Sequence, residues 1–121
     1  KESGAYDALL INRNGFITEG TRTNFFSIKD KIIYSPLEKD ILLGVMRKVV
    51  LKVASDNNYK IVETNIKFDD IKSYDGAFVT STSAKIIPIK SIDGNILNIP
   101  EFLKELMKLL NEFLEKNFHL Q

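Results

Sequence analysis

The sequence has 121 residues, a net charge of +1 and no cysteine. This length suits one domain with a hydrophobic core of its own. A charge so close to zero argues against binding to nucleic acid or to an anionic membrane. The lack of cysteine excludes disulfides and thiolate metal sites, and it fits a reducing, cytoplasmic compartment. No apolar run approaches the roughly 20 residues that a membrane-spanning helix needs.

The first third of the sequence predicts two β-hairpins. Asn14-Gly15 is a strong tight-turn pair, because both residues tolerate positive φ angles. The expected strands are residues 6–11, 16–19, 24–29 and 32–35.

A helix is predicted from Gly44, because apolar residues then recur at helical spacing. Its expected apolar face consists of Val45, Met46, Val49, Val50, Val53 and Ala54. We expect strands at 59–64, 76–80 and 84–92, and a short helical turn at 68–73. A final amphipathic helix should begin near Pro100, since proline suits the first helical position. The predicted fold class is α+β, with a mixed, largely antiparallel sheet and flanking helices.

Three polar clusters stand at expected strand ends or helix starts, where binding sites gather. The first is residues 18–24, in which a carboxylate precedes glycine, hydroxyls, arginine and an amide. The simpler interpretation is a polar hairpin loop that satisfies its own backbone.

The second cluster is residues 41–47, where an apolar turn leads through Gly44 into a helix. Free N–H groups at a helix start can hold a phosphate. The alternative is that Gly44 merely lets the chain turn. The third cluster, residues 80–83, has four hydroxyl side chains in a row after an apolar strand. These hydroxyls could bind a phosphate or carboxylate, or simply form a polar turn.

The three clusters occur in the order seen in class IV (fold type IV) pyridoxal-phosphate aminotransferases, which the sequence resembles from about residue 2 to residue 94. The stretches that carry the resemblance are AYDALLINRNGFITEGTRTNFF, ILLGVMR and AFVTSTSAKIIPIKSIDG. The family includes branched-chain and D-amino-acid aminotransferases and aminodeoxychorismate lyases. The resemblance implies a sheet curled toward a pseudo-barrel, the large C-terminal domain of these enzymes.

The resemblance also implies roles for individual residues around pyridoxal 5'-phosphate. Glu19 would meet the pyridine nitrogen, and Leu42 would pack on a face of the ring. Val45 and Met46 would offer backbone N–H groups to the phosphate, and Thr82 its hydroxyl. On the substrate side, Arg22 and Thr23 would lie near the ring or substrate, and the Ser83 N–H near the substrate carboxylate. No metal site is implied.

Two positions depart from the family pattern. Met46 stands where threonine is frequent, so a side-chain hydroxyl is missing although the backbone donor remains. Lys85 stands where an acidic residue is common.

The family's Schiff-base lysine lies further upstream than the eighteen residues before Glu19, and the small N-terminal domain precedes that lysine. We therefore expect residues 1–121 to be a single C-terminal cofactor domain that lacks both, and that carries no catalytic lysine of its own. The sequence also starts at Lys1, not at methionine.

The parent enzyme would exchange an amino group between an amino acid and a 2-oxo acid, as a homodimer. Two alternatives stay open: an aminodeoxychorismate lyase of the same fold, or a non-catalytic module that binds a phosphorylated ligand or a partner.

Overall fold

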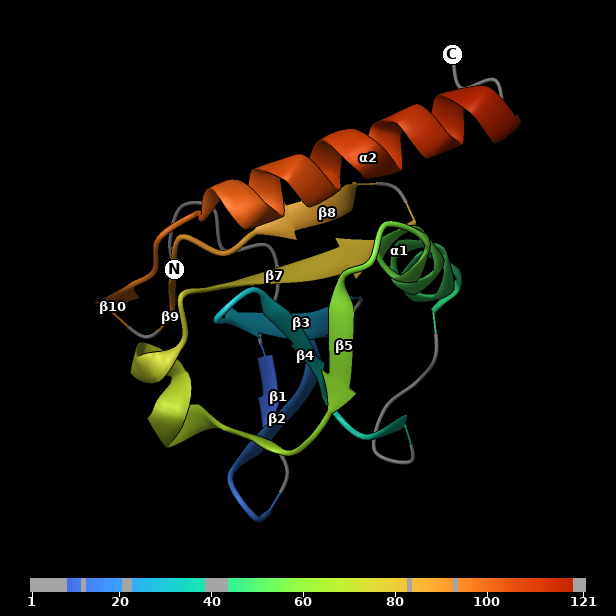
Figure 1. The fold of residues 1–121 in the computed structure, drawn as a ribbon. Helices are drawn as coiled ribbons and strands as arrows, with labels where there is room; N and C mark the ends of the chain where they lie inside the picture. The colour runs from blue at the N-terminus through green and yellow to red at the C-terminus, as the bar shows by residue number, and fades with distance from the viewer. Residues whose placement is uncertain are drawn as a thin grey trace.

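The computed structural model describes residues 9–11, 13–20, 23–38, 44–82, 84–92 and 94–118. Figure 1 shows two long helices packed on one side of a strongly curled sheet. The elements are β1 (Leu9–Ile11), β2 (Phe16–Gly20), β3 (Asn24–Lys29), β4 (Ile32–Ser35), α1 (Val45–Asp56), β5 (Lys60–Glu63), β6 (Ile66–Lys67), the 3₁₀ helix η2 (Phe68–Ser73), β7 (Gly76–Ser81), β8 (Lys85–Pro88), β9 (Ser91–Ile92), β10 (Asn95–Ile96) and α2 (Glu101–Phe118).

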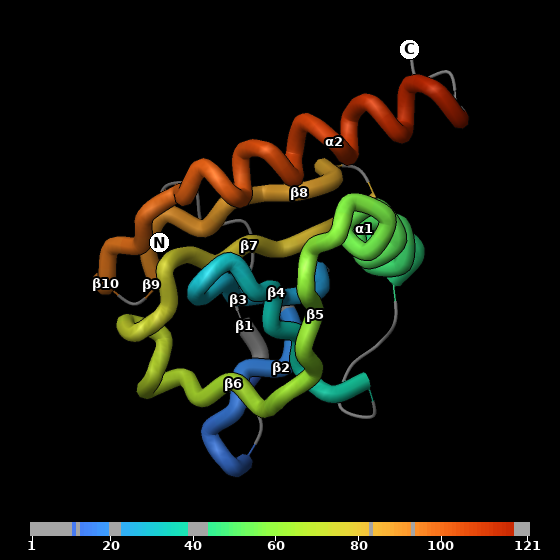
Figure 2. Tube along the Cα trace, in the orientation of Figure 1, coloured from blue at the N-terminus to red at the C-terminus, as the bar shows by residue number. Residues whose placement is uncertain are grey.

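An eight-stranded sheet is built around β3, which pairs antiparallel with β2, β4 and β7. β2 also pairs with β6, which follows β5 in the chain, so the sheet is strongly curled (Figure 2). β4 and β5 are parallel, and α1 connects them, as a parallel pair requires a crossover. The predicted α+β class with a mixed, largely antiparallel, curled sheet is confirmed.

Both faces of β3 and β7 are covered, so the first five residues of each strand are all buried. Phe26 and Phe78 are register partners, and their rings stack 4.9 Å apart in the core between the sheet and the helices. Phe25 and Val79 are also partners, and they face the second core, inside the curl of the sheet. Neighbouring residues of one strand therefore serve opposite cores.

Helix α1 buries an arginine that the apolar periodicity did not predict. The Arg47 side chain is only 2% exposed. Its Nη2 donates to Ser35 Oγ at 3.0 Å, and its Nη1 lies 3.2 Å from the Glu38 carboxylate. Arg47 thus ties the first turn of α1 to the end of β4. At the same turn, Val45 is 70% exposed, so its expected place on the apolar face is wrong.

Most expected elements are confirmed, and the differences lie in short segments. The single strand expected at 84–92 is wrong: β8 ends at Pro88, opposite Phe78, after which the Ile89 N–H still donates to β7, at the Ala77 carbonyl. Proline has no N–H to donate to a ladder, which favours the end of a strand there. The chain then forms a separate small ladder of β9 and β10. The two-residue β6 was not predicted either. The last helix begins at Glu101, one residue later than expected, and the Pro100 carbonyl accepts from its first turn.

Helix α2 lies across the sheet on an apolar stripe of Leu103, Leu106, Leu110 and Leu114. Asn117, near the end of the helix, is exposed, and its side chain donates to the Phe113 carbonyl. Across the described residues, neither helix is long and apolar enough to cross a membrane.

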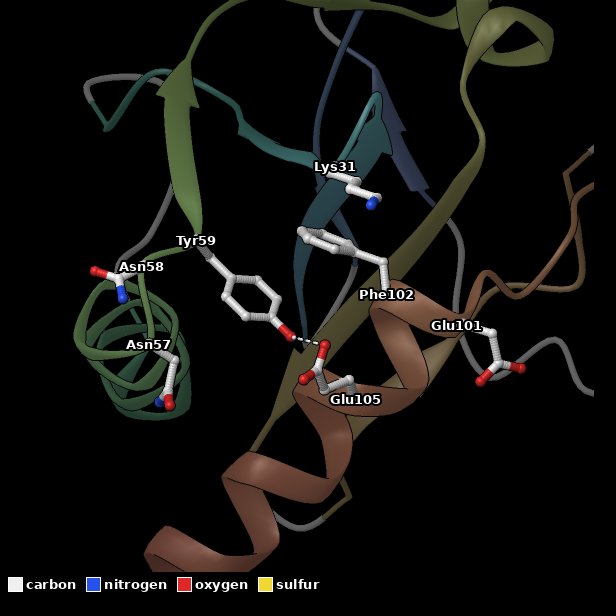
Figure 3. A pocket seen from close by; sticks show the side chains of 7 residues that line it. All are labelled: Lys31, Asn57, Asn58, Tyr59, Glu101, Phe102 and Glu105. Atoms are coloured by element: carbon white, nitrogen blue, oxygen red, sulfur yellow. Dashed lines mark hydrogen bonds between the residues drawn. The ribbon is translucent and has the colours of Figure 1, made fainter.

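A shallow hollow of about 610 Å³ lies where α2 meets the end of α1 and the start of β5 (Figure 3). There the Tyr59 ring packs on Phe102, with ring centroids 4.6 Å apart. The Tyr59 hydroxyl donates to the Glu105 carboxylate at 3.0 Å. Burial, followed by the hydrogen bond and charge of Glu105, raises the pKa of Tyr59 to about 12. These contacts fasten the first half of α2.

The raised pKa of Tyr59 predicts a specific loss of stability at alkaline pH. Because the folded pKa lies above the ordinary value of 10, the neutral hydroxyl stabilises the fold fully below pH 10. That contribution is lost as the pH rises from 10 to 12. Phenolate absorbance should include a transition with a midpoint near 12 that is absent from Tyr59→Phe, whereas Tyr74, whose pKa burial also raises, titrates in both proteins. In Glu105→Gln the midpoint should fall only part of the way toward 10, since burial is the larger cause. A wild-type Tyr59 midpoint at 10 would contradict this.

The burial of Arg47 predicts that its truncation destabilises the chain. Arg47→Ala should lower the free energy of unfolding by about 3 kcal/mol, because it removes packed side-chain volume and leaves Ser35 without its donor. Lys48→Ala, on the exposed neighbouring position, is the matched control and should change it by less than about 0.5 kcal/mol. Urea denaturation of the three proteins measures both. Equal stability of the two variants would show that Arg47 is not a structural tie.

Candidate functional site

The fold brings the three polar clusters together at Asn24, the first residue of β3. Asn24 is the register partner of Glu19 on β2 and of Thr80 on β7. Its side-chain Oδ1 also accepts a hydrogen bond of 3.2 Å from the Gly44 N–H, at the start of α1. One residue therefore touches or neighbours a member of every cluster, although the clusters lie far apart in the sequence. In Figure 1 the carboxyl end of β7 points toward α1.

Gly44 is required here for space rather than for backbone freedom. Its φ of −87° and ψ of 156° are extended angles that any residue can adopt. A Cβ atom at this position would lie 2.6 Å from Asn24 Oδ1, closer than real contacts allow. The backbone angles therefore give no reason for glycine, whereas the lack of a Cβ leaves room for the Asn24 side chain. Glycine lets the helix start approach β3.

The start of α1 offers backbone donors to a ligand. Gly44 caps the helix without a side-chain hydrogen bond, and the first turn carries no acidic residue. The first N–H groups of a helix have no partner within it, so those of Val45 and Met46 can bind an anion. The Val45 side chain is exposed while Met46 is 9% exposed and packs in the core. Methionine stands at position 46, where the family often has threonine, but the backbone N–H group at this position is the same for both residues.

The remaining predicted residues divide into two groups. Glu19, at the end of β2, and Thr23, just before β3, are both partly buried. Thr82 is exposed and directly follows β7, where Ser81 Oγ accepts from the Ala84 N–H at 3.1 Å. The predicted contacts of Leu42, Arg22 and Ser83 lie outside the residues that the structure describes.

Two buried residues of the site, Asn24 and Thr80, belong to the predicted clusters but were not predicted to bind the cofactor or the substrate. Asn24 is 6% exposed and Thr80 is 1% exposed. The Thr80 Oγ1 atom has no hydrogen-bond partner among the described residues, although an unpaired buried hydroxyl costs about 1–3 kcal/mol. Their position in the sequence was the signal that could have identified them, because each is a polar residue at or next to the end of a mostly apolar strand.

The residues present fit a ligand with an anionic group and a protonated ring nitrogen. Backbone N–H groups at the start of α1 suit a phosphate, and a carboxylate at Glu19 suits a cationic N–H. The buried Thr80 hydroxyl, which has no partner among the described residues, lies on β7 beside Asn24 and so at the same convergence. Pyridoxal 5'-phosphate has these two groups, so the donor set matches it.

The hollow in Figure 3 is a different place. It is lined by Asn57 and Asn58, beyond the last residue of α1. A helix of twelve residues is about 18 Å long, so the hollow and the start of α1 are well separated. The hollow therefore belongs to the packing of α2, and the candidate site is the convergence at Asn24.

Comparison with known proteins shows the family to which the chain is similar. Residues 1–92 match the family model described as amino-transferase class IV. A branched-chain-amino-acid aminotransferase from Pseudomonas aeruginosa is 37% identical over 91 residues, 75% of this chain and 30% of the relative. A D-alanine aminotransferase from Bacillus licheniformis is 38% identical over 98 residues, 80% of this chain and 34% of the relative. This chain thus spans about a third of the length of these relatives.

Solved structures share the fold. A branched-chain aminotransferase from the archaeon Thermoproteus uzoniensis, solved with norvaline, superposes with a TM-score of 0.81 and 30% identity, covering 93% of this chain and 39% of that one. A 4-amino-4-deoxychorismate lyase from Pseudomonas aeruginosa has a TM-score of 0.83 at 17% identity, over 99% of this chain and 43% of the lyase. The second likeness concerns the fold alone.

Three separated motifs meet at one residue, the donor set there suits a phosphorylated pyridine, and three quarters of the chain match a single family model. From sequence and fold together, this chain belongs to the class IV aminotransferase family.

Proposed function

We propose that this chain is the C-terminal cofactor-binding domain of a pyridoxal-phosphate-dependent enzyme that exchanges an amino group between an amino acid and a 2-oxo acid. The observation that carries the proposal is the convergence at Asn24, which joins the expected ring-nitrogen acceptor to the expected phosphate donors. The aminotransferase relatives, which include branched-chain and D-alanine enzymes, support the reaction class. They leave open the substrate and its stereochemistry.

In this proposal the cofactor is held at both ends. The backbone N–H groups of Val45 and Met46 and the hydroxyl of Thr82 bind the phosphate. Glu19 accepts a hydrogen bond from the pyridine N–H and so keeps a proton on that nitrogen. Leu42 packs on a face of the ring. When bound, the cofactor supplies a protonated ring that withdraws electrons from the substrate.

The substrate side is assigned by resemblance to the family. The Ser83 N–H binds the substrate carboxylate, and Arg22 and Thr23 lie beside the ring or substrate. The catalytic lysine and the small N-terminal domain belong to a part of the parent enzyme outside residues 1–121. We therefore expect the isolated chain to be inactive and the complete enzyme to be a cytoplasmic homodimer with its sites near the subunit interface.

A lyase that releases pyruvate from an aminodeoxychorismate-like substrate is the second candidate. It is supported by the similarity to a putative 4-amino-4-deoxychorismate lyase from Legionella pneumophila, which is 29% identical with a TM-score of 0.82 over 88% of this chain and 40% of that one. The full-length protein distinguishes the two reactions. Amino transfer to a 2-oxo acid supports the aminotransferase, whereas pyruvate release without an amino acceptor supports the lyase. A chain that binds phosphate esters but supports neither reaction as full-length protein would be a non-catalytic module.

Reduction with borohydride tests where the catalytic lysine lies. The chain is incubated with pyridoxal 5'-phosphate, reduced, and weighed by intact mass spectrometry. We expect no stoichiometric adduct on any single lysine, because none of the chain's lysines is assigned to the cofactor aldehyde. One stoichiometric adduct at one lysine would overturn that assignment. A chain extended at its N-terminus to include the upstream lysine serves as the positive control.

Replacement of Glu19 tests the acceptor for the ring nitrogen. In the full-length protein, Glu19→Gln should lower kcat by on the order of 100-fold, because the amide no longer holds the proton on the nitrogen. Cofactor binding should change much less, since the phosphate contacts remain. Glu63→Gln, at an exposed position on β5, is the matched control and should keep full activity. Unchanged kcat in Glu19→Gln would remove Glu19 from the site.

A further inference from the structure

We propose that Asn24 is a positioning residue that holds the phosphate-binding start of α1 against the strand that neighbours Glu19. The inference rests on the proposed function, because it assigns Asn24 to the placement of the same cofactor. Asn24 acts through the Gly44 backbone and needs no contact with the cofactor itself.

The first support is the contact between Asn24 and Gly44. Asn24 Oδ1 accepts the Gly44 N–H at 3.2 Å, and the Asn24 residue is 6% exposed. Gly44 immediately precedes Val45, whose N–H is one of the two proposed phosphate donors. The hydrogen bond therefore fixes the backbone one residue before those donors. A displaced helix start would move both of them away from the phosphate.

The second support is the close fit at Gly44. A Cβ there would meet Asn24 Oδ1 at 2.6 Å and Asn24 Cγ at 3.8 Å, and no other atom of the described residues within 4 Å. The extended backbone of Gly44 does not need glycine for its angles. The glycine therefore has one visible structural reason, which is the approach of the Asn24 side chain.

The third support is the position of Asn24 in the sheet. Glu19 and Thr80 are its partners on the two neighbouring strands, and paired strands lie about 4.8 Å apart. Asn24 therefore stands between the proposed acceptor of the ring nitrogen and the polar end of β7. Its backbone lies beside the proposed acceptor of the ring nitrogen, while its side chain binds the backbone at the start of α1.

The chain offers a matched control for a purely structural role. Asn57 is the C-cap of the same helix, and its Nδ2 donates to the Val53 carbonyl at 2.8 Å. Asn57→Ala therefore removes an asparagine hydrogen bond from α1 at the end away from the proposed phosphate site. Both Asn24→Ala and Asn57→Ala should lower stability, but only the first should change how the protein recognises a phosphate.

The experiment compares the dissociation constants of pyridoxine 5'-phosphate and pyridoxine for the full-length protein, by fluorescence titration. Neither probe has an aldehyde, so neither can bind a lysine covalently. The ratio of the two constants isolates the contribution of the phosphate. Denaturant unfolding of each variant separately measures its stability.

We expect the wild-type protein to bind the phosphate ester more tightly. In Asn24→Ala the ratio should shrink by about tenfold, as expected for the loss of one well-placed interaction. Asn57→Ala should keep the wild-type ratio. Gly44→Ala should reproduce the loss, because its methyl group displaces the Asn24 side chain. The double variant should be no worse than Asn24→Ala, since both changes break the same contact.

The outcomes separate the two proposals. A wild-type protein that does not distinguish the two probes overturns the proposed function, and the role of Asn24 with it. A wild-type protein that distinguishes them, with Asn24→Ala and Gly44→Ala keeping the wild-type ratio, overturns the role of Asn24 alone. Equal weakening of both probes in Asn24→Ala also overturns it, because that is a structural effect. If Asn24→Ala does not fold, Gly44→Ala decides by the same ratio.

Discussion

The pairing of β3 with β7 is the constraint on which the rest of the structure depends. Five register pairs join the two strands. Through them Phe26 stacks on Phe78 in one core, and Phe25 lies beside Val79 in the other. The pair at one end of this ladder is Asn24 with Thr80, and it places these two polar residues beside the start of α1. A shift of this register by one residue would exchange the two faces of the strand and remove both cores at once.

Helix α1 is held at its first turn by polar contacts and along its length by apolar ones. Asn24 binds the backbone just before the helix, and Arg47 reaches back to Ser35 and Glu38. Buried polar contacts fix the orientation of a helix more strictly than apolar packing does, because a buried polar group that loses its hydrogen-bond partner destabilises the fold. A helix start that is fixed in this way can present its free N–H groups to a phosphate without reorganising.

Much of the fold followed from local patterns. The boundaries of β3 and β4 were predicted to the residue, and α1 begins one residue after Gly44 as expected, because hairpin turns and helical periodicity are properties of neighbouring residues. The predictions failed where the extent of a strand depends on the strand that it pairs with. The segment from residue 84 to 92 is apolar enough for one strand, but its ladder with β7 ends at Pro88, and residues 91–92 pair with β10 instead. Two-residue strands such as β6 carry no periodicity, so no pattern could reveal them.

The sequence by itself determined the family motifs, their order, and the residue types that a phosphorylated pyridine requires. It also determined that Gly44 precedes a helix. Only the tertiary structure decided why Gly44 is glycine, because the Asn24 side chain that occupies its space lies twenty residues earlier in the chain. The burial of Arg47 and the exposure of Val45 were likewise decided by what packs against α1. Periodicity identifies an apolar face, but the neighbouring strand determines which residues at the helix start are covered.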